Sequence, residues 1–568
     1  MAAPRRTPLR RLAPVAALAV AALTASACLP ISTGELSGQP SSPPSSGSVS
    51  AQPLSAQTKA WWSYDREATY QSITTKVTVP TRDGTQLSCT LVRPATSSAP
   101  AAGTFPGIVT EFTPYSLLHD TYVNSEATYF ATRGYNALVC TLRGVGGSGG
   151  TWQNAMSAQD GKDGYDLVEW LAAQPFSNGR IGMTGESYGG DTTYATAINQ
   201  PPHLVAIAPL QSPSDLYHDV IYPGGIKATE GGDIDNWPGT AELMSGGVIN
   251  PANEYATNRA HPTYDDYWQS RSFLGRHDSI NVPVFTMGGW VDQYFRSGEL
   301  ANIEGALGRT WAIYGQWTHL LPLTYPNCGP LCNSDGLAPG IVLAWFDHWI
   351  KQLPDVPIPA KPTFVSYAGA TASAPGWREI VGYDPNDTAT QSFALNTAGT
   401  TGTTGTASTT GTATTAAGTA GTVTFHQPQD PSTSGGSVLF QTSPLTTAMS
   451  IFGHSTLTLK ATLSGTDANF YVELIDVGTD GKQTLVNNGF LRASHRTSDV
   501  VPMPVQAGES VTYTIPIRAD DWQFAAGHRI ALRISGGASS MLTQNSTPVD
   551  VAIATGAGGS ALTLPTIS

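Results

Sequence analysis

The sequence predicts an α/β domain followed by an antiparallel β-sandwich, and three observations support this prediction. Between residues 60 and 355, short apolar runs typical of buried strands alternate with segments that have helical spacing. From residue 358 onward, the apolar runs are short and alternating, and helical segments are scarce. The chain has 568 residues, which is too long for one compact core. We therefore expect two domains, at 60–355 and 358–568.

The elements of the first domain follow from the spacing of its apolar residues. A hairpin is predicted over 77–92, and helices are predicted over 163–174 and 188–199. Buried strands are predicted at 105–112, 135–142, 180–184, 204–210 and 282–287. Residues 213–280 are rich in aromatic residues and glycine and hold no clear strand, so we expect a partly helical cap there.

The second domain is predicted from alternating strands separated by turn residues. Four clear examples lie at 457–459, 469–476, 510–516 and 529–535. One internal segment, 397–422, consists almost entirely of Thr, Gly and Ala. Because such a composition cannot bury an apolar core, we expect a disordered loop there. The whole region reads as a jelly-roll-like β-sandwich.

The first 27 residues are typical of an export signal. Four arginines precede the apolar run 12–25, and three small residues follow as a cleavage site. This run is shorter than the roughly 20 residues that a membrane-spanning helix needs. Removal of residues 1–27 would change the formal net charge from −13 to −13 − 4 = −17. With no clustered Lys and Arg, we expect no nucleic-acid partner.

Cys28 follows the predicted export signal directly. The stretch 23–28 resembles a bacterial lipobox, which would make Cys28 a lipid-modified first residue, and residues 28–59 have the Ser- and Pro-rich composition of a tether. We therefore expect an extracellular protein or a cell-surface lipoprotein of a bacterium. The alternative is simple secretion. Contact with a membrane is expected only through this anchor.

Four further cysteines suggest disulfides, because an even number in an exported chain is typical of them. They are Cys89, Cys140, Cys328 and Cys332. Cys328 and Cys332 are close enough in sequence to close a small loop. No His lies at metal-ligand spacing from either residue, so we expect no zinc site.

Residues 185–189 match the Gly-x-Ser-x-Gly pattern of a nucleophile elbow. The elbow requires a strand before the serine and a helix after it. Ser187 meets this requirement, since the strand 180–184 precedes it and the helix 188–199 follows it. A second match at 146–150 lies in a glycine-rich loop with no helix directly after it, so Ser148 is interpreted as a turn residue. The predicted nucleophile is Ser187, and the predicted fold is an α/β-hydrolase.

A serine hydroxyl needs a neighbouring base that is oriented by a carboxylate. In α/β-hydrolases the chain order is Ser, then the acid, then His. The strand 282–287 ends just before Asp292, and the apolar segment 311–314 ends just before His319. Both candidates lie beyond the carboxyl ends of strands, where sites form in such sheets. Asp292 and His319 are therefore the predicted acid and base.

Several segments, taken together, resemble the CocE/NonD hydrolase family (cocaine esterase / X-prolyl dipeptidyl aminopeptidase-like). The segments of the first domain are Thr113–Tyr115, Arg143-Gly144 with Gly146 and Ser148, Asp163–Ala172, Gln174–Arg180, Gly289–Asp292 and Gly315–His319. In the last domain, Phe470–Val477, Gly489–Ala493 and Gly527–Ile530 are similar to the family's jelly roll. The resemblance covers residues 60–568. It implies the same roles for Ser187, Asp292 and His319.

The resemblance also implies features that the motifs alone do not. The Tyr115 hydroxyl and the Tyr188 backbone N–H would form the oxyanion hole, and no metal or cofactor would be needed. The family fold places the strand around Cys89 beside the strand around Cys140, which implies a disulfide between them. One departure is Thr141, which stands where the family usually has an acidic residue. The tryptophans Trp237, Trp290 and Trp317 are candidates either for the acyl pocket or for core packing.

The sequence is compatible with three functions. The first is hydrolysis of small esters or amides. The second is an X-prolyl dipeptidyl-peptidase acting on short peptides, which would need an acidic group for the free amine; the candidates are Asp215, Asp219, Glu230, Asp233 and Asp235 of the cap. The third is a surface-binding protein with a vestigial hydrolase, which the presence of a complete Ser, Asp and His set argues against.

Overall fold

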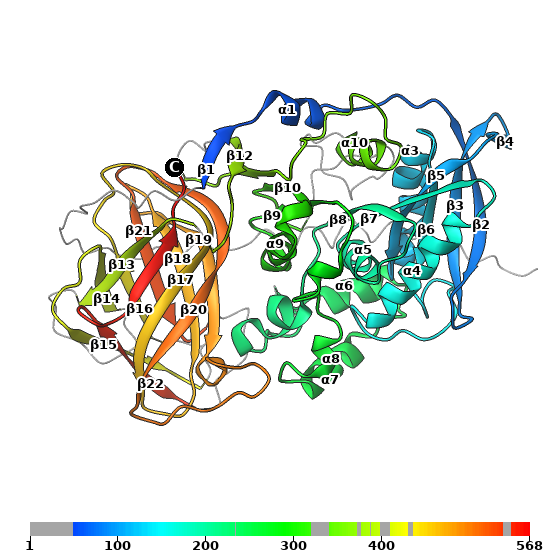
Figure 1. Cartoon of the computed structure of the whole chain (residues 1–568). Coiled ribbons are helices and arrows are strands. Elements are labelled where there is room, and N and C mark those ends of the chain that lie inside the picture. The colour runs from blue at the N-terminus through cyan, green and yellow to red at the C-terminus, as the bar shows by residue number, and fades with distance from the viewer. Residues whose placement is uncertain are drawn as a thin grey trace, which may run out of the picture.

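The computed structural model contains two domains that lie side by side (Figure 1). It describes residues 49–232, 234–319, 340–371, 376–386, 388–397, 409–429, 436–537 and 547–568. The predicted export signal, Cys28, Cys328 and Cys332 lie outside the described residues. No helix in the described ranges is long and apolar enough to cross a membrane.

The first domain is built on a 12-stranded sheet whose central strands are parallel. The order is β1-β12-β11-β10-β9-β8-β7-β5-β6-β3-β2, with β4 paired to β3. Strands β5 to β11 form the parallel centre, while β1, β2, β3, β4 and β12 make antiparallel pairs on either side of it. The bounds are β1 (Ser50–Pro53), β2 (Gln71–Pro80), β3 (Gln86–Thr96), β4 (Ala99–Pro100), β5 (Phe105–Thr113), β6 (Asn136–Thr141), β7 (Ser177–Glu186), β8 (Leu204–Leu210), β9 (Val284–Gly289), β10 (Thr310–Gly315), β11 (Phe364–Tyr367) and β12 (Trp377–Val381).

Helices cover both faces of this sheet, which explains why its central strands are apolar throughout. Successive residues of β5 point to opposite faces: Val109 belongs to the core beneath α4 and α5, and Ile108 to the core beneath α10. The helices are α1 (Ala56–Trp62), α2 (His119–Tyr122), α3 (Thr128–Ala131), α4 (Ala158–Ala172), α5 (Tyr188–Ile198), α9 (Arg296–Gly305) and α10 (Gly340–Trp349). The predicted α/β architecture is therefore confirmed.

The cap is formed by short helices, as predicted for 213–280. They are η5 (Tyr217–Ile221), η6 (Pro223–Gly225), α6 (Trp237–Met244), α7 (Pro251–Ala260), α8 (Asp266–Gln269) and η7 (His277–Ser279). No strand is assigned to the described residues of this region, although Glu230 and Asp235 form an isolated bridge. The cap lies beside the second domain, and the backbone N–H of Tyr264 donates to the carbonyl of Asp499 at 2.9 Å.

Two predicted boundaries of the first domain are wrong. Residues 50–59 were assigned to the tether, but β1 pairs with β12, and α1 packs on α10 with the Trp61 indole donating to the Ile341 carbonyl at 3.0 Å. The second domain was predicted to begin at 358, but β11 and β12 continue the first sheet. In both cases the partner strand is far away in sequence, so local composition could not reveal the pairing.

The second domain is an 11-stranded antiparallel-rich sheet folded around one apolar core, consistent with the predicted β-sandwich (Figure 1). Its order is β15-β22-β17-β20-β19-β18-β21-β16-β14-β13-β23, and β17 also pairs with β23. The bounds are β13 (Thr390–Thr397), β14 (Thr409–Thr414), β15 (Gly421–Gln427), β16 (Ser437–Gln441), β17 (Met449–Leu463), β18 (Asn469–Val477), β19 (Gln483–Arg492), β20 (Ser510–Phe524), β21 (Arg529–Ser535), β22 (Val549–Thr555) and β23 (Ala561–Pro565).

The prediction of a disordered loop over 397–422 is wrong where the structure describes this segment. Residues 409–414 form β14, which pairs with β13 on one side and β16 on the other, and β15 begins at Gly421. The β-branched Thr residues suit a strand, and partners on both sides satisfy the backbone. Residues 398–408 lie outside the described residues.

The predicted disulfide between Cys89 and Cys140 is present. The two cysteines face each other directly across the antiparallel pair β3 and β6, and their sulfur atoms are bonded. They are buried within the core shared by the sheet and α4. The bond therefore joins β3, which pairs antiparallel with β2 and β6, to the outermost strand of the parallel centre.

Candidate active site

Ser187 lies at the sharp turn between β7 and α5. Its φ of 59° is unusual for a residue with a side chain. The conformation is held by hydrogen bonds from the Ser187 N–H to the Leu210 carbonyl at 2.9 Å and from the Asp191 N–H to the Ser187 carbonyl at 3.1 Å. A Cβ atom on Gly185 would approach the Gly189 backbone to 2.7 Å, so the flanking glycine is required by the close turn. This is the strand–turn–helix context predicted for Ser187.

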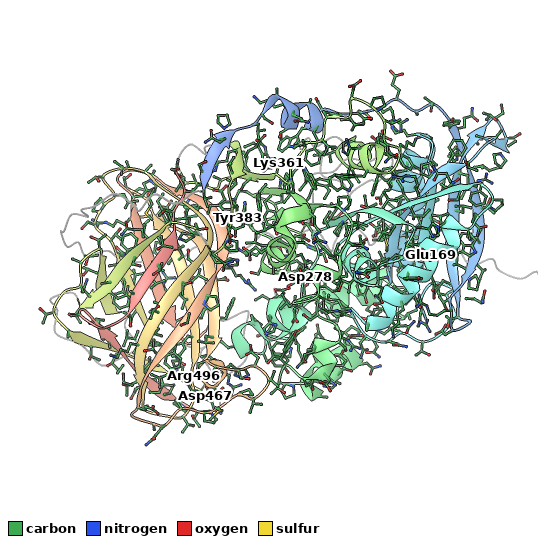
Figure 2. The ribbon with its side chains drawn as sticks, in the orientation of Figure 1. Glu169, Asp278, Lys361, Tyr383, Asp467 and Arg496 are labelled. Carbon is green, nitrogen blue, oxygen red and sulfur yellow. A yellow bond between two sulfur atoms is a disulfide. The ribbon has the colours of Figure 1, made fainter. Side chains whose placement is uncertain are left out.

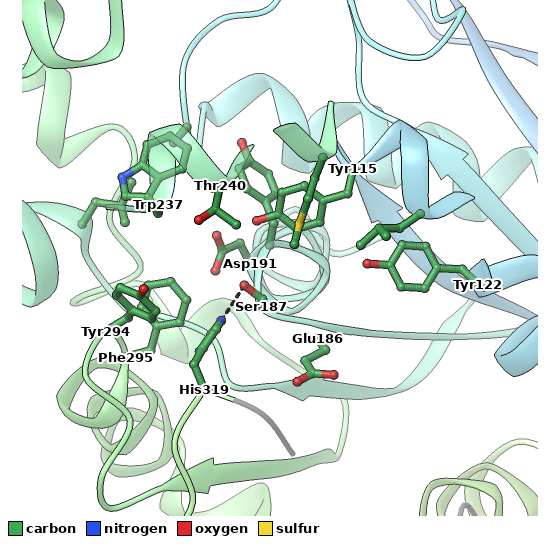
Figure 3. Close-up of a pocket in the computed structure, with 15 residues that line it drawn as sticks. Tyr115, Tyr122, Glu186, Ser187, Asp191, Trp237, Thr240, Tyr294, Phe295 and His319 are labelled. Carbon is green, nitrogen blue, oxygen red and sulfur yellow. Dashed lines mark hydrogen bonds between the residues drawn. The ribbon is translucent and has the colours of Figure 1, made fainter. Parts of the chain in front are cut away.

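The three predicted residues meet in one hydrogen-bonded chain (Figure 3). His319 Nε2 lies 2.9 Å from Ser187 Oγ, and His319 Nδ1 lies 2.8 Å from Asp292 Oδ2. With the proton on Nδ1, the imidazole donates to Asp292 and accepts from the Ser187 hydroxyl. The side chains come from the carboxyl ends of β7, β9 and β10, which are parallel neighbours through β8. The geometry is that of a nucleophile, a base and an orienting acid.

The electrostatics of the pair of Asp292 and His319 favour a charged imidazole. Burial acts to raise the pKa of Asp292, but the His319 charge and two backbone N–H donors bring it below its ordinary value. These donors are the N–H groups of Tyr294 at 2.8 Å and Phe295 at 3.2 Å. Burial acts to lower the pKa of His319, but Asp292, helped by Glu186, raises it above its ordinary value. Asp292 is thus held as a carboxylate beside the ring.

Tyr115 lies on the side of Ser187 away from His319 (Figure 3), and Tyr188 directly follows Ser187 in the chain. Burial and the charge of Asp191 raise the pKa of Tyr115 far above its usual range, while a contact of its hydroxyl with Ser187 opposes this rise. The hydroxyl therefore stays protonated and can donate. Tyr188 is the first residue of α5, so its N–H has no acceptor within the helix and lies at the positive end of the helix dipole. Both predicted oxyanion donors are thus adjacent to Ser187.

The Tyr188 side chain has a separate, structural role. Its hydroxyl donates to Asp160 Oδ2 at 3.0 Å and accepts from the Met156 N–H at 2.9 Å. Burial raises the pKa of Asp160 to about 7. This network fixes the start of α5 against α4. Sequence analysis did not identify Asp160, and no local motif marks it.

The glycine loop after β6 is held without the acidic residue that Thr141 replaces. The Ser148 hydroxyl donates to the Thr141 carbonyl at 2.8 Å and accepts from the Ser88 N–H at 2.8 Å, and it also lies 2.9 Å from Thr141 Oγ1. Ser148 is therefore a turn residue, as predicted. Arg143 is fixed by ion pairs with Asp163 at 2.6 Å and Asp83 at 2.9 Å.

A cavity of about 180 Å³ opens onto Ser187. It is mostly apolar and is lined by Tyr115, Leu118, Tyr122, Ala155, Glu186, Ser187, Tyr188, Asp191, Leu216, Trp237, Thr240, Met244, Tyr294, Phe295 and His319. Of the three candidate tryptophans, only Trp237 lines it. Trp290 is fully buried between Tyr314 and Phe364, and Trp317 packs on Trp377.

Two carboxylates of this cavity were not predicted as site residues. Glu186 and Asp191 flank the nucleophile turn within one helical turn of Ser187, so their position next to the motif was the available signal. Burial, together with Asp160, Glu299 and Asp219, raises the pKa of Asp191 well above its ordinary value, although Ser212 donates to it at 3.0 Å. Neither of them was among the acids considered for the free amine of a peptide.

The cap acids considered for an amine site are occupied elsewhere. Asp215 accepts from the Tyr264 hydroxyl at 2.6 Å, and Asp219 accepts from the Ser214 N–H at 3.1 Å. Glu230 pairs with Arg259, and Asp235 pairs with Lys227 at 2.9 Å. Asp233 lies outside the described residues. None of the four described acids lines the cavity at Ser187.

Comparison with known proteins agrees with this geometry. Residues 83–321 match the family profile described as X-Pro dipeptidyl-peptidase (S15 family), and residues 347–553 match the X-Pro dipeptidyl-peptidase C-terminal non-catalytic domain. The chain is 26% identical over 544 residues to cocaine esterase from Rhodococcus sp. (strain MB1 Bresler), which covers 82% of this chain and 90% of that protein.

Two solved structures share the fold of both domains. A CocE/NonD family hydrolase from Staphylococcus aureus superposes with a TM-score of 0.68 at 19% identity, covering 87% of this chain and 94% of that chain. An aminopeptidase from a marine sediment archaeon (Thaumarchaeota archaeon) superposes with a TM-score of 0.66 at 19% identity, covering 89% and 98%. At this level of identity, the two structures support the fold alone.

Proposed function

Since this chain belongs to the CocE/NonD family and is a serine hydrolase, we propose that it cleaves ester or amide acyl bonds through Ser187, His319 and Asp292. The observation that supports the proposal most strongly is the unbroken chain of hydrogen bonds from Ser187 Oγ through the His319 ring to Asp292. Ser187 and His319 both line a cavity in which an acyl group would contact the serine.

In the proposed mechanism, His319 Nε2 takes the proton of Ser187 as Oγ attacks the acyl carbon. The imidazolium that forms is stabilised by Asp292, which also fixes the proton on Nδ1. His319 then gives the proton to the leaving alcohol or amine, and an acyl-enzyme remains on Ser187. Water, activated by the same imidazole, hydrolyses the acyl-enzyme and restores the free serine.

Negative charge develops on the acyl oxygen during both attacks. We assign its stabilisation to the Tyr115 hydroxyl, which lies on the side of Ser187 away from His319 (Figure 3), and to the Tyr188 N–H at the start of α5. Each such donor contributes roughly 3–4 kcal/mol to the stability of the transition state in comparable enzymes. The raised pKa of Tyr115 keeps its proton available at neutral pH.

Small, mostly apolar acyl groups fit the cavity best, so an esterase or amidase is the first candidate. The second candidate is an X-prolyl dipeptidyl-peptidase, which the family of the catalytic segment includes. Glu186 and Asp191 line the cavity and are the acids available to hold a free amine in that case. The four described cap acids are bonded to other partners and do not line this cavity.

We also propose that a bacterium exports this enzyme and anchors it to the cell surface through Cys28. The composition of residues 1–27, the lipobox-like stretch 23–28 and the tether that follows support this proposal. A disulfide between Cys89 and Cys140 suits an oxidising compartment. If a Cys28→Ser variant stayed in the membrane fraction as the wild type does, the anchor would have to be rejected.

A paired assay on the full chain and its Ser187→Ala variant tests the proposed reaction. The substrates are a short-chain p-nitrophenyl ester and an Ala-Pro anilide. Ester turnover that is lost in the variant, with little anilide turnover, supports the esterase. Fast anilide turnover that is also lost supports the dipeptidyl-peptidase. A folded wild type that is inert to both substrates and unlabelled by a fluorophosphonate would refute Ser187 as a nucleophile and favour a surface-binding protein.

A further inference from the structure

The loop that carries Asp292 is tied down at its far end by Arg296, the first residue of α9. The Arg296 Nε donates to the backbone carbonyl of Asp292 at 2.9 Å, four residues earlier. The Tyr314 hydroxyl of β10 lies 3.3 Å from the Arg296 carbonyl and donates to it. The guanidinium therefore closes the loop from which the Asp292 carboxylate reaches His319.

The same guanidinium reaches across to the second domain. Its Nη1 donates to Asn487 Oδ1 of β19 at 3.0 Å. Asn487 is fully buried and is itself fixed, because its amide nitrogen donates to the Ala519 carbonyl of β20 at 2.7 Å. The partner that holds Arg296 is thus a rigid part of the β-sandwich, and Arg296 connects it directly to Asp292.

Charged groups from several elements surround Arg296. Burial lowers its pKa, while Asp520 of β20, Asp292 of its own loop and Tyr471 of β18 act in the opposite direction. Arg518 of β20 is a second buried cation nearby, and its pKa is lowered to about 10 by burial and by Arg296. Burying a guanidinium costs folding free energy unless the group is hydrogen-bonded. Loss of the bonds from Arg296 to the Asp292 carbonyl and to Asn487 would therefore be unfavourable.

Two other contacts near the domain boundary involve parts of the first domain away from this loop. Tyr383, labelled in Figure 2 where the domains meet, donates to Glu304 near the end of α9. Arg378 of β12 forms a buried ion pair with Asp521 of β20. Neither residue contacts Asp292 or His319 in the described hydrogen bonds. Arg296 differs because its side chain bonds the loop of the acid and the second domain at once.

We propose that Arg296 is a positioning residue for Asp292, and that the second domain supports the active site through the bond between Asn487 and Arg296. The proposal rests on the roles proposed above for Asp292 and His319. The second domain is then part of the support of the acid, although it contributes no residue to the cavity.

A pH profile distinguishes positioning from a general structural role. Asp292 raises the pKa of His319, so a less well-held Asp292 raises it less. A base with a lower pKa stays neutral at lower pH, and the acidic limb of the rate profile then moves toward lower pH. Asn487→Ala and Arg296→Lys test this, because neither changes the net charge. Asn487→Ala removes the acceptor of Arg296 Nη1, and Arg296→Lys removes the planar set of donors that only arginine provides.

The experiment measures kcat and KM for a p-nitrophenyl ester from pH 5 to 9 on the full chain. Arg378→Lys is the matched control, since it makes the same substitution at the same domain boundary. We expect kcat of Asn487→Ala and Arg296→Lys to fall about tenfold with KM nearly unchanged, and the acidic limb to shift downward. The control should keep kcat and KM within about twofold of the wild-type values. Thermal unfolding verifies that each variant is folded.

Two results would overturn the proposal. The first is that both test variants have the pH profile and the kcat of the wild type. The second is that Arg378→Lys changes kcat and the acidic limb as much as the test variants do. The rate of labelling by a fluorophosphonate, measured over the same pH range, provides a readout that needs no substrate. If the wild type is labelled but hydrolyses no ester, the proposed substrate class fails while the labelling profiles still decide the role of Arg296. If it is not labelled either, both proposals fall.

Discussion

The Tyr115 hydroxyl is the group whose removal gives the sharpest test of the proposed oxyanion hole. A Tyr115→Phe substitution deletes one oxygen and keeps the ring, which packs edge-on against Tyr188 with centroids 6.3 Å apart. The hydroxyl contacts Ser187, whose own hydroxyl is also bonded to His319. The substitution therefore leaves no buried donor without its acceptor, and little change in folding stability is expected.

The expected loss lies in the chemical step. Deleting one of two oxyanion donors costs about 3–4 kcal/mol of transition-state stabilisation, which corresponds to a fall in kcat of about 10²- to 10³-fold. KM should change little, because the ground-state carbonyl gains much less from this donor than the oxyanion does. The assay is steady-state hydrolysis of a short-chain p-nitrophenyl ester, with thermal unfolding measured in parallel.

Tyr122→Phe is the matched control for this prediction. Tyr122 lines the same cavity and is half-buried, as Tyr115 is, but in Figure 3 it lies farther from Ser187. The control should retain kcat within about twofold. A Tyr115→Phe enzyme with nearly wild-type kcat, or an equal loss in both variants, would refute the assignment of Tyr115 to the oxyanion.

Two further predictions follow from the site and the fold. The raised pKa of His319 places the acidic limb of kcat/KM above the ordinary value for histidine, about 6.5; activity should rise with pH through that limb, because the base must be neutral. Asp292→Asn should lower kcat by several orders of magnitude and move the limb downward, and an unshifted limb in its residual activity would contradict the coupling. Breaking the disulfide with Cys89→Ala and Cys140→Ala releases a loop with a sequence separation of 51 residues. The loss of loop-closure constraint predicts a decrease of about 4 kcal/mol in the free energy of unfolding, measured by urea denaturation of the first domain's transition. A decrease below about 1 kcal/mol would show that the unfolded chain is not constrained in this way.

Both domains take part in supporting the site, although only the first supplies its residues. The cap and the acid loop each contact the sandwich: Arg518 donates to the Asp219 carbonyl at 3.3 Å, and Arg296 donates to Asn487 at 3.0 Å. The cap and the Asp292 loop bound the cavity on two sides. A substitution at this boundary is therefore expected to affect both substrate binding in the cavity and the position of Asp292.

The local sequence was sufficient to predict the elements that generate the chemistry. A nucleophile turn needs a strand, two glycines and a helix in direct succession, so residues 180–199 contain the whole signal for Ser187. The chain order of such hydrolases and the ends of two apolar strands then located Asp292 and His319. The disulfide between Cys89 and Cys140 was different, because only the family resemblance implied which cysteines would be neighbours.

Only the tertiary structure decided what depends on partners far away in the chain. The strand β1 and helix α1 lie in a segment with the composition of a tether, and β14 in one with the composition of a loop. Each is stabilised by strands or helices that local propensity cannot anticipate. The same holds for Asn487, which is 191 residues beyond Arg296 in the chain. Short-range patterns encode turns, strands and motifs, whereas the contact that we propose to hold the acid in place exists only once the two domains have packed together.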